Sequence, residues 1–303
     1  MRRSLTALAL AAALGLIAGC SDDGGTVRSE GGTGSAGSGS GSGSGLSASD
    51  LGTQSTDKRI TAATGAYQTW VVGQVAGLRT DTKKFTDAVR AGDVAGAKAR
   101  YAPSRVNWER IEPIAGLVPE LDGTLDSRVD DFANVDDSKW TGWHKLEYLL
   151  WVKNTTAGGA AVATRLDTDL ATLETKVKAL ELTPKAVALG AGELIEEVSE
   201  GKIDGEEERY SRTDLWDFGA NVQGAEQAFS VFRPILADRD QALATSLRSG
   251  FTAVEKSLTP YQLAGGGYKP YTALTAADKA RMQAQLAALS EGLAKVPAAL
   301  GVA

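Results

Sequence analysis

Apolar residues recur at helical spacing along most of this chain. From about residue 57 to residue 298 the sequence is dominated by Ala, Leu, Val, Lys and Glu, and no alternating apolar and polar run is long enough to predict a strand. The pattern therefore predicts an all-α body. The expected helices cover residues 57–79, 81–91, 93–117, 138–153, 160–181, 184–200, 212–234, 238–258 and 275–298.

Capping residues mark where several of these helices begin. Asp93 and Thr275 each precede a helical run, and Thr183 is followed by a proline at the first helical position. Many helices joined by connections of medium length predict two bundles of about four helices each. The segments expected to be irregular are 119–137, 201–211 and 259–274.

The first fifty residues differ in composition from the helical body. Residues 1–20 combine a basic start, an apolar run too short to span a bilayer, and a final cysteine, which is typical of a lipoprotein signal peptide. Residues 21–50 are mostly small and polar and predict a flexible tether, so residues 51–303 form the folded domain. We expect lipidated Cys20, the only cysteine, to anchor the protein to the outer face of the cell membrane.

The charge balance argues against nucleic-acid binding. The chain has 32 basic and 38 acidic residues, a net charge of −6, and no basic patch interleaved with aromatic residues. We therefore expect no nucleic-acid partner, and contact with the membrane through the lipid anchor only.

The only histidine of the chain is a candidate metal ligand. Glu147 follows His144 by three residues, so both side chains share one helical face, and an imidazole beside a carboxylate suits a transition metal. A second pair, Glu109 and Glu112, has the same spacing on another predicted helix, where like charges repel unless a cation or proton lies between them. Each pair is also compatible with a solvated polar face.

Three separate runs, in this order, resemble the imelysin family and, more narrowly, iron-uptake lipoproteins of the EfeO/EfeM type. They are residues 101–113 (YAPSRVNWERIEP), 140–147 (WTGWHKLE) and 210–222 (YSRTDLWDFGANV). The resemblance covers about residues 55–300. It implies two four-helix bundles with a metal site in the cleft between them.

The resemblance also implies which residues bind the metal. The family's H-x-x-E motif matches His144 and Glu147, and Glu109 and Glu112 are further ligand candidates. Looser matches are Asp126, Glu206 and Glu208. In such systems the lipoprotein captures iron outside the membrane and delivers it to a membrane permease, alongside a haem peroxidase. Oxygen ligands with one imidazole favour Fe³⁺ or Fe²⁺, and Zn²⁺ is also compatible.

The sequence departs from longer family members and leaves two other functions open. Those members carry an N-terminal cupredoxin-like domain, whose place is taken here by the predicted tether. Some imelysin relatives are classified as peptidases, but a single histidine cannot supply an H-E-x-x-H zinc site, so we expect no enzymatic activity. Another branch of the family suggests cation-dependent binding of an acidic polysaccharide.

Overall fold

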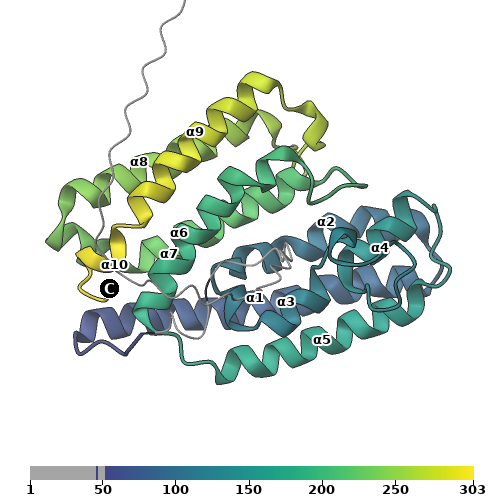
Figure 1. Ribbon diagram of the computed structural model, residues 1–303, viewed down its shortest axis with the longest axis horizontal. Coiled ribbons are helices and arrows are strands. Elements are labelled where there is room, and N and C mark those ends of the chain that lie inside the picture. The colour runs from purple at the N-terminus through teal and green to yellow at the C-terminus, as the bar shows by residue number, and fades with distance from the viewer. Residues whose placement is uncertain (1–45, 47–51) are drawn as a thin grey trace, which may run out of the picture. The chain divides into compact units, whose positions relative to one another are not determined.

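The structure is a computed structural model that describes Leu46 and residues 52–303 (Figure 1). Over this part of the chain the secondary structure is helical, apart from one isolated bridge between Gln262 and Tyr268. The α-helices are α1 (Lys58–Arg90), α2 (Val94–Ile111), α3 (Pro119–Leu125), α4 (Gly142–Trp151), α5 (Gly159–Ala179), α6 (Pro184–Glu200), α7 (Asp214–Arg239), α8 (Gln241–Leu258), α9 (Ala276–Leu293) and α10 (Val296–Ala299). The 3₁₀ helices are η2 (Glu112–Leu117), η3 (Val129–Asp131), η4 (Lys202–Asp204), η5 (Thr259–Tyr261) and η6 (Tyr271–Ala273). The predicted all-α class is confirmed.

The N-terminal predictions concern residues that are mostly outside this range. The predicted signal peptide with Cys20, and nearly all of the predicted tether, lie outside the described residues. Leu46 is the exception. It is 3% exposed, and its side chain lies so close to Gly190 of α6 that a Cβ there would approach it to 2.7 Å. One apolar residue of the predicted tether therefore packs against the helical domain.

Several predicted helix boundaries were wrong, among them the end expected at residue 234, because α7 continues through Pro234 to Arg239. The break expected near residue 80 is absent because the buried stripe of α1 continues through Leu78, Thr82 and Phe85. The helix expected over 93–117 changes to 3₁₀ geometry at Glu112, just before Pro113. A proline has no backbone N–H, so it cannot continue the α-helical hydrogen bonds. The segment 119–137, expected to be irregular, contains the short helices α3 and η3.

The helices pack as two groups that meet where α2 contacts α7, and Figure 1 shows α8 and α9 of one group above α1 and α5 of the other. In the first group α1 packs along α2 and α5, and α4 contacts α2 and α5. In the second group α6, α7, α8 and α9 form a four-helix bundle. The groups approach closely where α7 crosses α2, since a Cβ at Gly224 would lie 2.2 Å from the Arg110 carbonyl oxygen. This seam positions the candidate site.

One further result concerns the membrane. Within residues 52–303, no helix is both long enough and apolar enough to cross a bilayer.

Candidate metal centre

Buried carboxylates from both helix groups converge beside the α2–α7 seam. Each of them is at most 2% exposed, and they come from α2, η2, the end of α3, α4, the turn after η4 and α7. Ionised carboxylates are rarely this buried unless cations lie among them. They are Glu109, Glu112, Asp126, Glu147, Glu207, Glu208 and Asp217.

The end of α2 supplies the first pair of acids. Glu109 is in the last turn of α2 and Glu112 is the first residue of η2. Because Pro113 cannot donate a backbone hydrogen bond, the Glu109 carbonyl needs another donor, and Asn221 Nδ2 of α7 lies 3.0 Å from it. The same amide nitrogen donates to Glu109 Oε2 at 3.0 Å and also to Glu112. Asn221 thus fixes this pair against α7.

A glycine brings α4 against the end of α3. Gly142, the first residue of α4, has φ of +80°, and a Cβ there would lie 2.1 Å from the Leu125 carbonyl oxygen. Only glycine fits this close approach. The contact places His144 beside Asp126, whose Oδ1 lies 3.2 Å from His144 Nε2. Trp108 Nε1 donates to the other oxygen of Asp126 at 2.8 Å.

The turn before α7 holds Glu147 and Glu208. The backbone N–H groups of Tyr210 and Ser211 donate to Glu147 Oε1 at 2.9 and 2.6 Å, and the Ser211 hydroxyl donates to Glu208 Oε2 at 2.8 Å. Arg212, next in the chain, has φ of +61°. A non-glycine residue in this left-handed region marks a strained turn held by its surroundings.

The acids form two groups whose ligand atoms lie close enough to share an ion. The first, named the histidine group, consists of His144, Glu147 and Glu208, with one ligand atom from each within 4.8 Å of the others. His144 Nδ1 lies 3.4 Å from Glu147 Oε2 and 4.0 Å from Glu208 Oε1. One imidazole nitrogen therefore faces two carboxylates.

The second group, named the lysine group, consists of Glu109, Glu112, Asp126 and Glu207, also within 4.8 Å of one another. The ammonium of Lys202, from η4, lies among them. Its Nζ is 2.7 Å from Glu112 Oε2, 3.0 Å from Glu207 Oε1 and 3.6 Å from Glu109 Oε2. A cation of the chain itself thus occupies the middle of this group.

A buried arginine lies between the two groups. Arg105 is fully buried and forms ion pairs with Asp126 and Glu109 of the lysine group and, at 2.8 Å, with Glu208 of the histidine group. Its guanidinium also lies over the ring of Trp143, 5.5 Å from the ring centre. Arg105 and Lys202 together carry fewer charges than the surrounding carboxylates, so the cluster needs further protons or a further cation.

The pKa shifts of these groups follow from burial first and from the neighbouring charges second. Burial raises the pKa of Glu112 and of Glu208 well above their ordinary range, and neighbouring carboxylates add to the effect. Burial opposes the charge of Asp126, but Arg105 and His144 outweigh it and lower the pKa of that carboxyl. Burial and Arg105 likewise oppose protonation of His144, but the adjacent carboxylates of Asp126 and Glu147 raise its pKa to about 10. Without a metal ion, His144 is an imidazolium at neutral pH.

Asp217 is the least satisfied of these acids. It is 1% exposed, and neither of its oxygens accepts a hydrogen bond from the described residues. Arg105 Nε lies 3.5 Å from its Oδ1, and burial raises the pKa of this carboxyl well above its ordinary value. Buried polar atoms are normally paired, so an acid left without a donor indicates room for a further cation or proton.

A small cavity reaches the histidine group. Its volume is about 10 Å³, close to the space that a single water molecule needs, and its lining includes His144, Glu147, Glu206 and Glu207. Arg209, which also lines it, forms an ion pair with Asp130 at the surface. The lysine group has contact with this cavity only through Glu207.

The structure brings most of the sequence-predicted ligands together. His144, Glu147 and Glu208 fall in the histidine group, and Glu109, Glu112 and Asp126 fall in the lysine group. Glu206 lies outside both groups. It is exposed and lines the cavity, whereas its neighbour Glu207 is buried among the acids.

Sequence reasoning missed the residues that neutralise and fix the acids. Arg105 precedes Glu109 by four residues, a spacing that pairs side chains on a helix, so the sequence did hold a signal for it. Asp217 and Asn221 lie inside the run 210–222 but were not singled out. Lys202 is in a segment expected to be an irregular loop, where no periodicity could have indicated its burial.

Comparisons with known proteins agree with this architecture. The family model for imelysin (peptidase M75) matches residues 63–296. The chain is also similar to an imelysin-like protein from Psychrobacter arcticum 273-4 of known crystal structure, with a TM-score of 0.60 and 11% sequence identity, over 83% of this chain and 98% of that one. That likeness concerns the fold.

Two curated relatives are more similar in sequence. The chain is 45% identical over 237 residues to the iron uptake system component EfeO of Yersinia pseudotuberculosis, and 43% identical over 238 residues to that of Escherichia coli K12. Each alignment covers 78% of this chain and 63% of the relative, so the chain spans less than two thirds of the length of these relatives.

Proposed function

The chain belongs to the imelysin family, and we propose that it binds iron outside the cytoplasm and delivers it to a membrane permease of an Efe-type iron-uptake system. Two relatives more than 40% identical are named as iron-uptake components, which supports this cargo over the other ions. The observation that carries the proposal is the buried excess of carboxylates around His144.

In this proposal the ion binds at the histidine group. It takes the place of the His144 Nδ1 proton and is held by Glu147 and Glu208, which already face that nitrogen at 3.4 and 4.0 Å. Asp126, 3.2 Å from Nε2, keeps the imidazole oriented, because a metal-bound histidine commonly donates its other N–H to a carboxylate. Glu109 and Glu112, the other candidate ligands, stay paired with Lys202 and hold the surrounding helices.

The donor set suits iron. Carboxylate oxygens with one imidazole nitrogen match a hard or borderline cation, and the described residues offer no thiolate for a soft one. Either Fe³⁺ or Fe²⁺ fits these ligands, and Zn²⁺ remains a competitor. In this proposal the ion enters on the side of the small cavity, where Glu206 lies exposed.

Metal titration of the purified chain tests the proposal. We expect one equivalent of iron to bind and to displace Zn²⁺ and Mn²⁺ in competition calorimetry. Binding only to the folded state should raise the free energy of unfolding by about 2.7 kcal/mol at a hundredfold excess over the dissociation constant. Saturation without any rise in melting temperature, or a preference for Zn²⁺, would contradict an iron carrier.

The proposal includes anchoring through Cys20. A lipid on this cysteine would keep the carrier at the outer face of the cell membrane, close to the permease and a haem peroxidase. The Cys20→Ser chain should then be released from the membrane fraction or retained as an uncleaved precursor. Identical fractionation and mobility of this variant and the parent would oppose the anchor.

We propose a carrier and not a peptidase. The relatives are named as iron-uptake components, and a zinc peptidase usually needs three protein ligands, an open position for water and a separate base. Here one imidazole is shared with acids that are almost fully buried, beside a cavity of about 10 Å³. Binding of an acidic polysaccharide has no observation of its own in its favour.

A further inference from the structure

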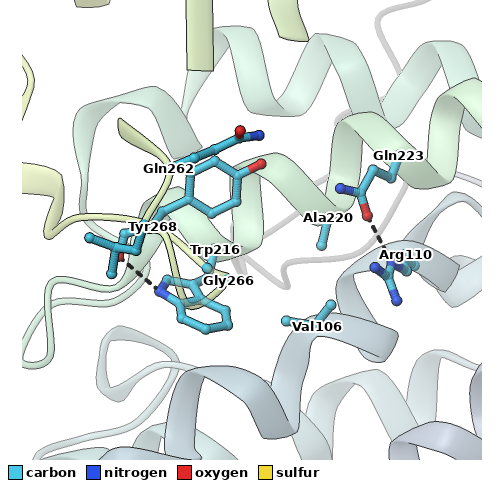
Figure 2. A pocket seen from close by; sticks show the side chains of 10 residues that line it. Val106, Arg110, Trp216, Ala220, Gln223, Gln262, Gly266 and Tyr268 are labelled. Carbon is cyan, nitrogen blue, oxygen red and sulfur yellow. Dashed lines mark hydrogen bonds between the residues drawn. The ribbon is translucent and has the colours of Figure 1, made fainter. Parts of the chain in front are cut away.

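A larger pocket lies beside the α2–α7 seam, on different helix faces from the acid cluster. Its volume is about 310 Å³, which is within the range of small-ligand sites. Figure 2 shows Val106 and Arg110 of α2 on one side and Trp216 and Tyr268 on the other. The rest of the lining comes from Ala220 and Gln223 of α7 and the loop 262–267.

The pocket and the acid cluster use neighbouring stripes of the same two helices. On α2, Val106 and Arg110 follow Arg105 and Glu109 by one residue, which turns them by about 100° around the helix axis. The residues that line the pocket include no Asp or Glu. It is therefore a separate site with the opposite sign of charge.

Arg110 carries the charge of the pocket without an acidic partner. Within the described residues the guanidinium forms no ion pair with a carboxylate and is instead held by neutral oxygens. Gln223 Oε1 accepts from Nε at 2.9 Å, and Nη1 donates to Asn107 Oδ1 at 3.1 Å and to Gln74 Oε1 at 3.4 Å. Burial lowers the pKa of this arginine from its ordinary value. A half-buried cation that is oriented but not neutralised favours an anion in the pocket.

The opposite wall presents two aromatic rings that are held in place. The indole N–H of Trp216 donates to the Tyr268 carbonyl oxygen at 3.2 Å (Figure 2). Gly267 has φ of +78°, and a Cβ there would lie 1.8 Å from the Trp216 ring. The Tyr268 ring packs in the same way on Gly219, where a Cβ would approach it to 2.7 Å. These contacts fix the loop that covers the pocket.

We propose that this pocket binds a small aromatic monocarboxylate of the benzoate class. Nη2 of Arg110, which makes no hydrogen bond with the described residues, can donate to a carboxylate oxygen, and the rings of Trp216 and Tyr268 match a flat apolar body. The single positive charge of Arg110 can neutralise one carboxylate of a ligand. A phosphate dianion or a tricarboxylate would bring unpaired charge close to the acid cluster of the same helices, so these anions are disfavoured.

Calorimetric titration of the full chain, without added metal, tests this site. The probes are benzoate and salicylate, with citrate and inorganic phosphate as the competing anions. We expect saturable binding of the aromatic monocarboxylates and at least about tenfold weaker binding of citrate and phosphate. Arg110→Gln should weaken benzoate binding by at least about tenfold, because a charge-assisted pair is lost.

Matched variants make the result decisive. Arg100→Gln removes an exposed arginine of the same helix whose guanidinium donates to the Gly96 carbonyl oxygen, and it should leave benzoate binding unchanged. His144→Ala should also leave it unchanged, so failure of the iron proposal and of this one can be told apart. No saturable binding, binding of citrate or phosphate as tight as that of benzoate, or full binding by a folded Arg110→Gln chain would overturn the proposal.

Discussion

The histidine group and the lysine group are built from the same kind of ligand but are neutralised differently. In the histidine group Arg105 already pairs with Glu208 at 2.8 Å, but the positive charge that faces Glu147 is a proton on His144, which another cation can replace. In the lysine group the charge beside Glu112 and Glu207 is the ammonium of Lys202, which is attached to the chain. Burial of acids alone therefore does not identify an ion site.

The difference indicates which group exchanges its cation. A proton can leave when a metal ion arrives, because ligand deprotonation is part of metal binding. Lys202 could leave only by moving its side chain out of a buried position where it contacts three carboxylates. We therefore expect the histidine group to take the ion and the lysine group to hold the surrounding helices together.

The largest effect should come from removing the imidazole. His144→Ala eliminates the nitrogen ligand, and we expect its dissociation constant for iron to rise by at least about a hundredfold. Glu112→Gln keeps the shape of the lysine group and removes one charge, and we expect less than about a tenfold change. Calorimetry on both folded variants makes the comparison. A larger loss in Glu112→Gln than in His144→Ala would reverse the assignment of the two groups.

Removing the ammonium of Lys202 should lower the stability of the chain more than it lowers its affinity for iron. Lys202→Met leaves Glu112 and Glu207 buried without their ammonium, and breaking a buried ion pair costs about 3–5 kcal/mol. We expect a loss of that size in the free energy of unfolding of the metal-free chain, measured in urea. Because the pKa of Glu112 is already raised by burial, the loss should be smaller at pH 5 than at pH 8.

A Lys202→Met chain as stable as the parent at pH 8 would show that the lysine group does not depend on its ammonium. Lys176→Met is a suitable control, because the Lys176–Glu120 pair is exposed and such pairs contribute little.

The two groups should also differ in how pH affects them. The folded pKa of His144, about 10, is above its unfolded value, so its contribution to metal-free stability is complete below about pH 6.5 and is lost as the pH rises through 10. Iron must displace this proton, so affinity should rise with pH between 6 and 8, by up to about tenfold per unit.

Titrations of the parent at several pH values should show this rise, and His144→Ala should lose most of it. An affinity that does not change with pH would mean that no proton of the histidine group is displaced.

The smallest effect concerns the residues that support the ligands. Ser211→Ala removes the hydroxyl that donates to Glu208 at 2.8 Å but leaves the backbone N–H that donates to Glu147. We expect about a tenfold weaker affinity for iron with little change in melting temperature. Ser290→Ala, at a part-buried hydroxyl far along the chain in α9, serves as the control. Unchanged affinity in Ser211→Ala would mean that Glu208 needs no such support.

The fold was largely predictable, because the helical period of the apolar residues is a local signal. The errors in the predicted helix boundaries also arose from local sequence features. The sequence near residue 80 did not show that the buried stripe of α1 continues, and Pro113 changes the helix type where a continuous helix was expected. The burial of Leu46 could not be foreseen, since it depends on a contact with Gly190 that is distant in the sequence.

Most candidate ligands of the site could be predicted from the sequence, but the basic residues that neutralise them could not. Spacing paired His144 with Glu147 and Glu109 with Glu112. The sequence could not show whether Glu206 or Glu207 is the buried acid. Both lie in an irregular turn, where no helical period predicts which side chain points inward. The position of Lys202 is a product of tertiary packing, and it is this residue that separates the lysine group from the histidine group.

Anomalous X-ray scattering at the iron edge, from crystals of the iron-loaded chain, tests the central claim most directly. The account predicts one iron peak bound by His144 Nδ1, Glu147 and Glu208, with Lys202 still beside Glu112. An iron peak among Glu109, Glu112 and Glu207 with the Lys202 side chain displaced would contradict it, and so would the absence of iron from both groups.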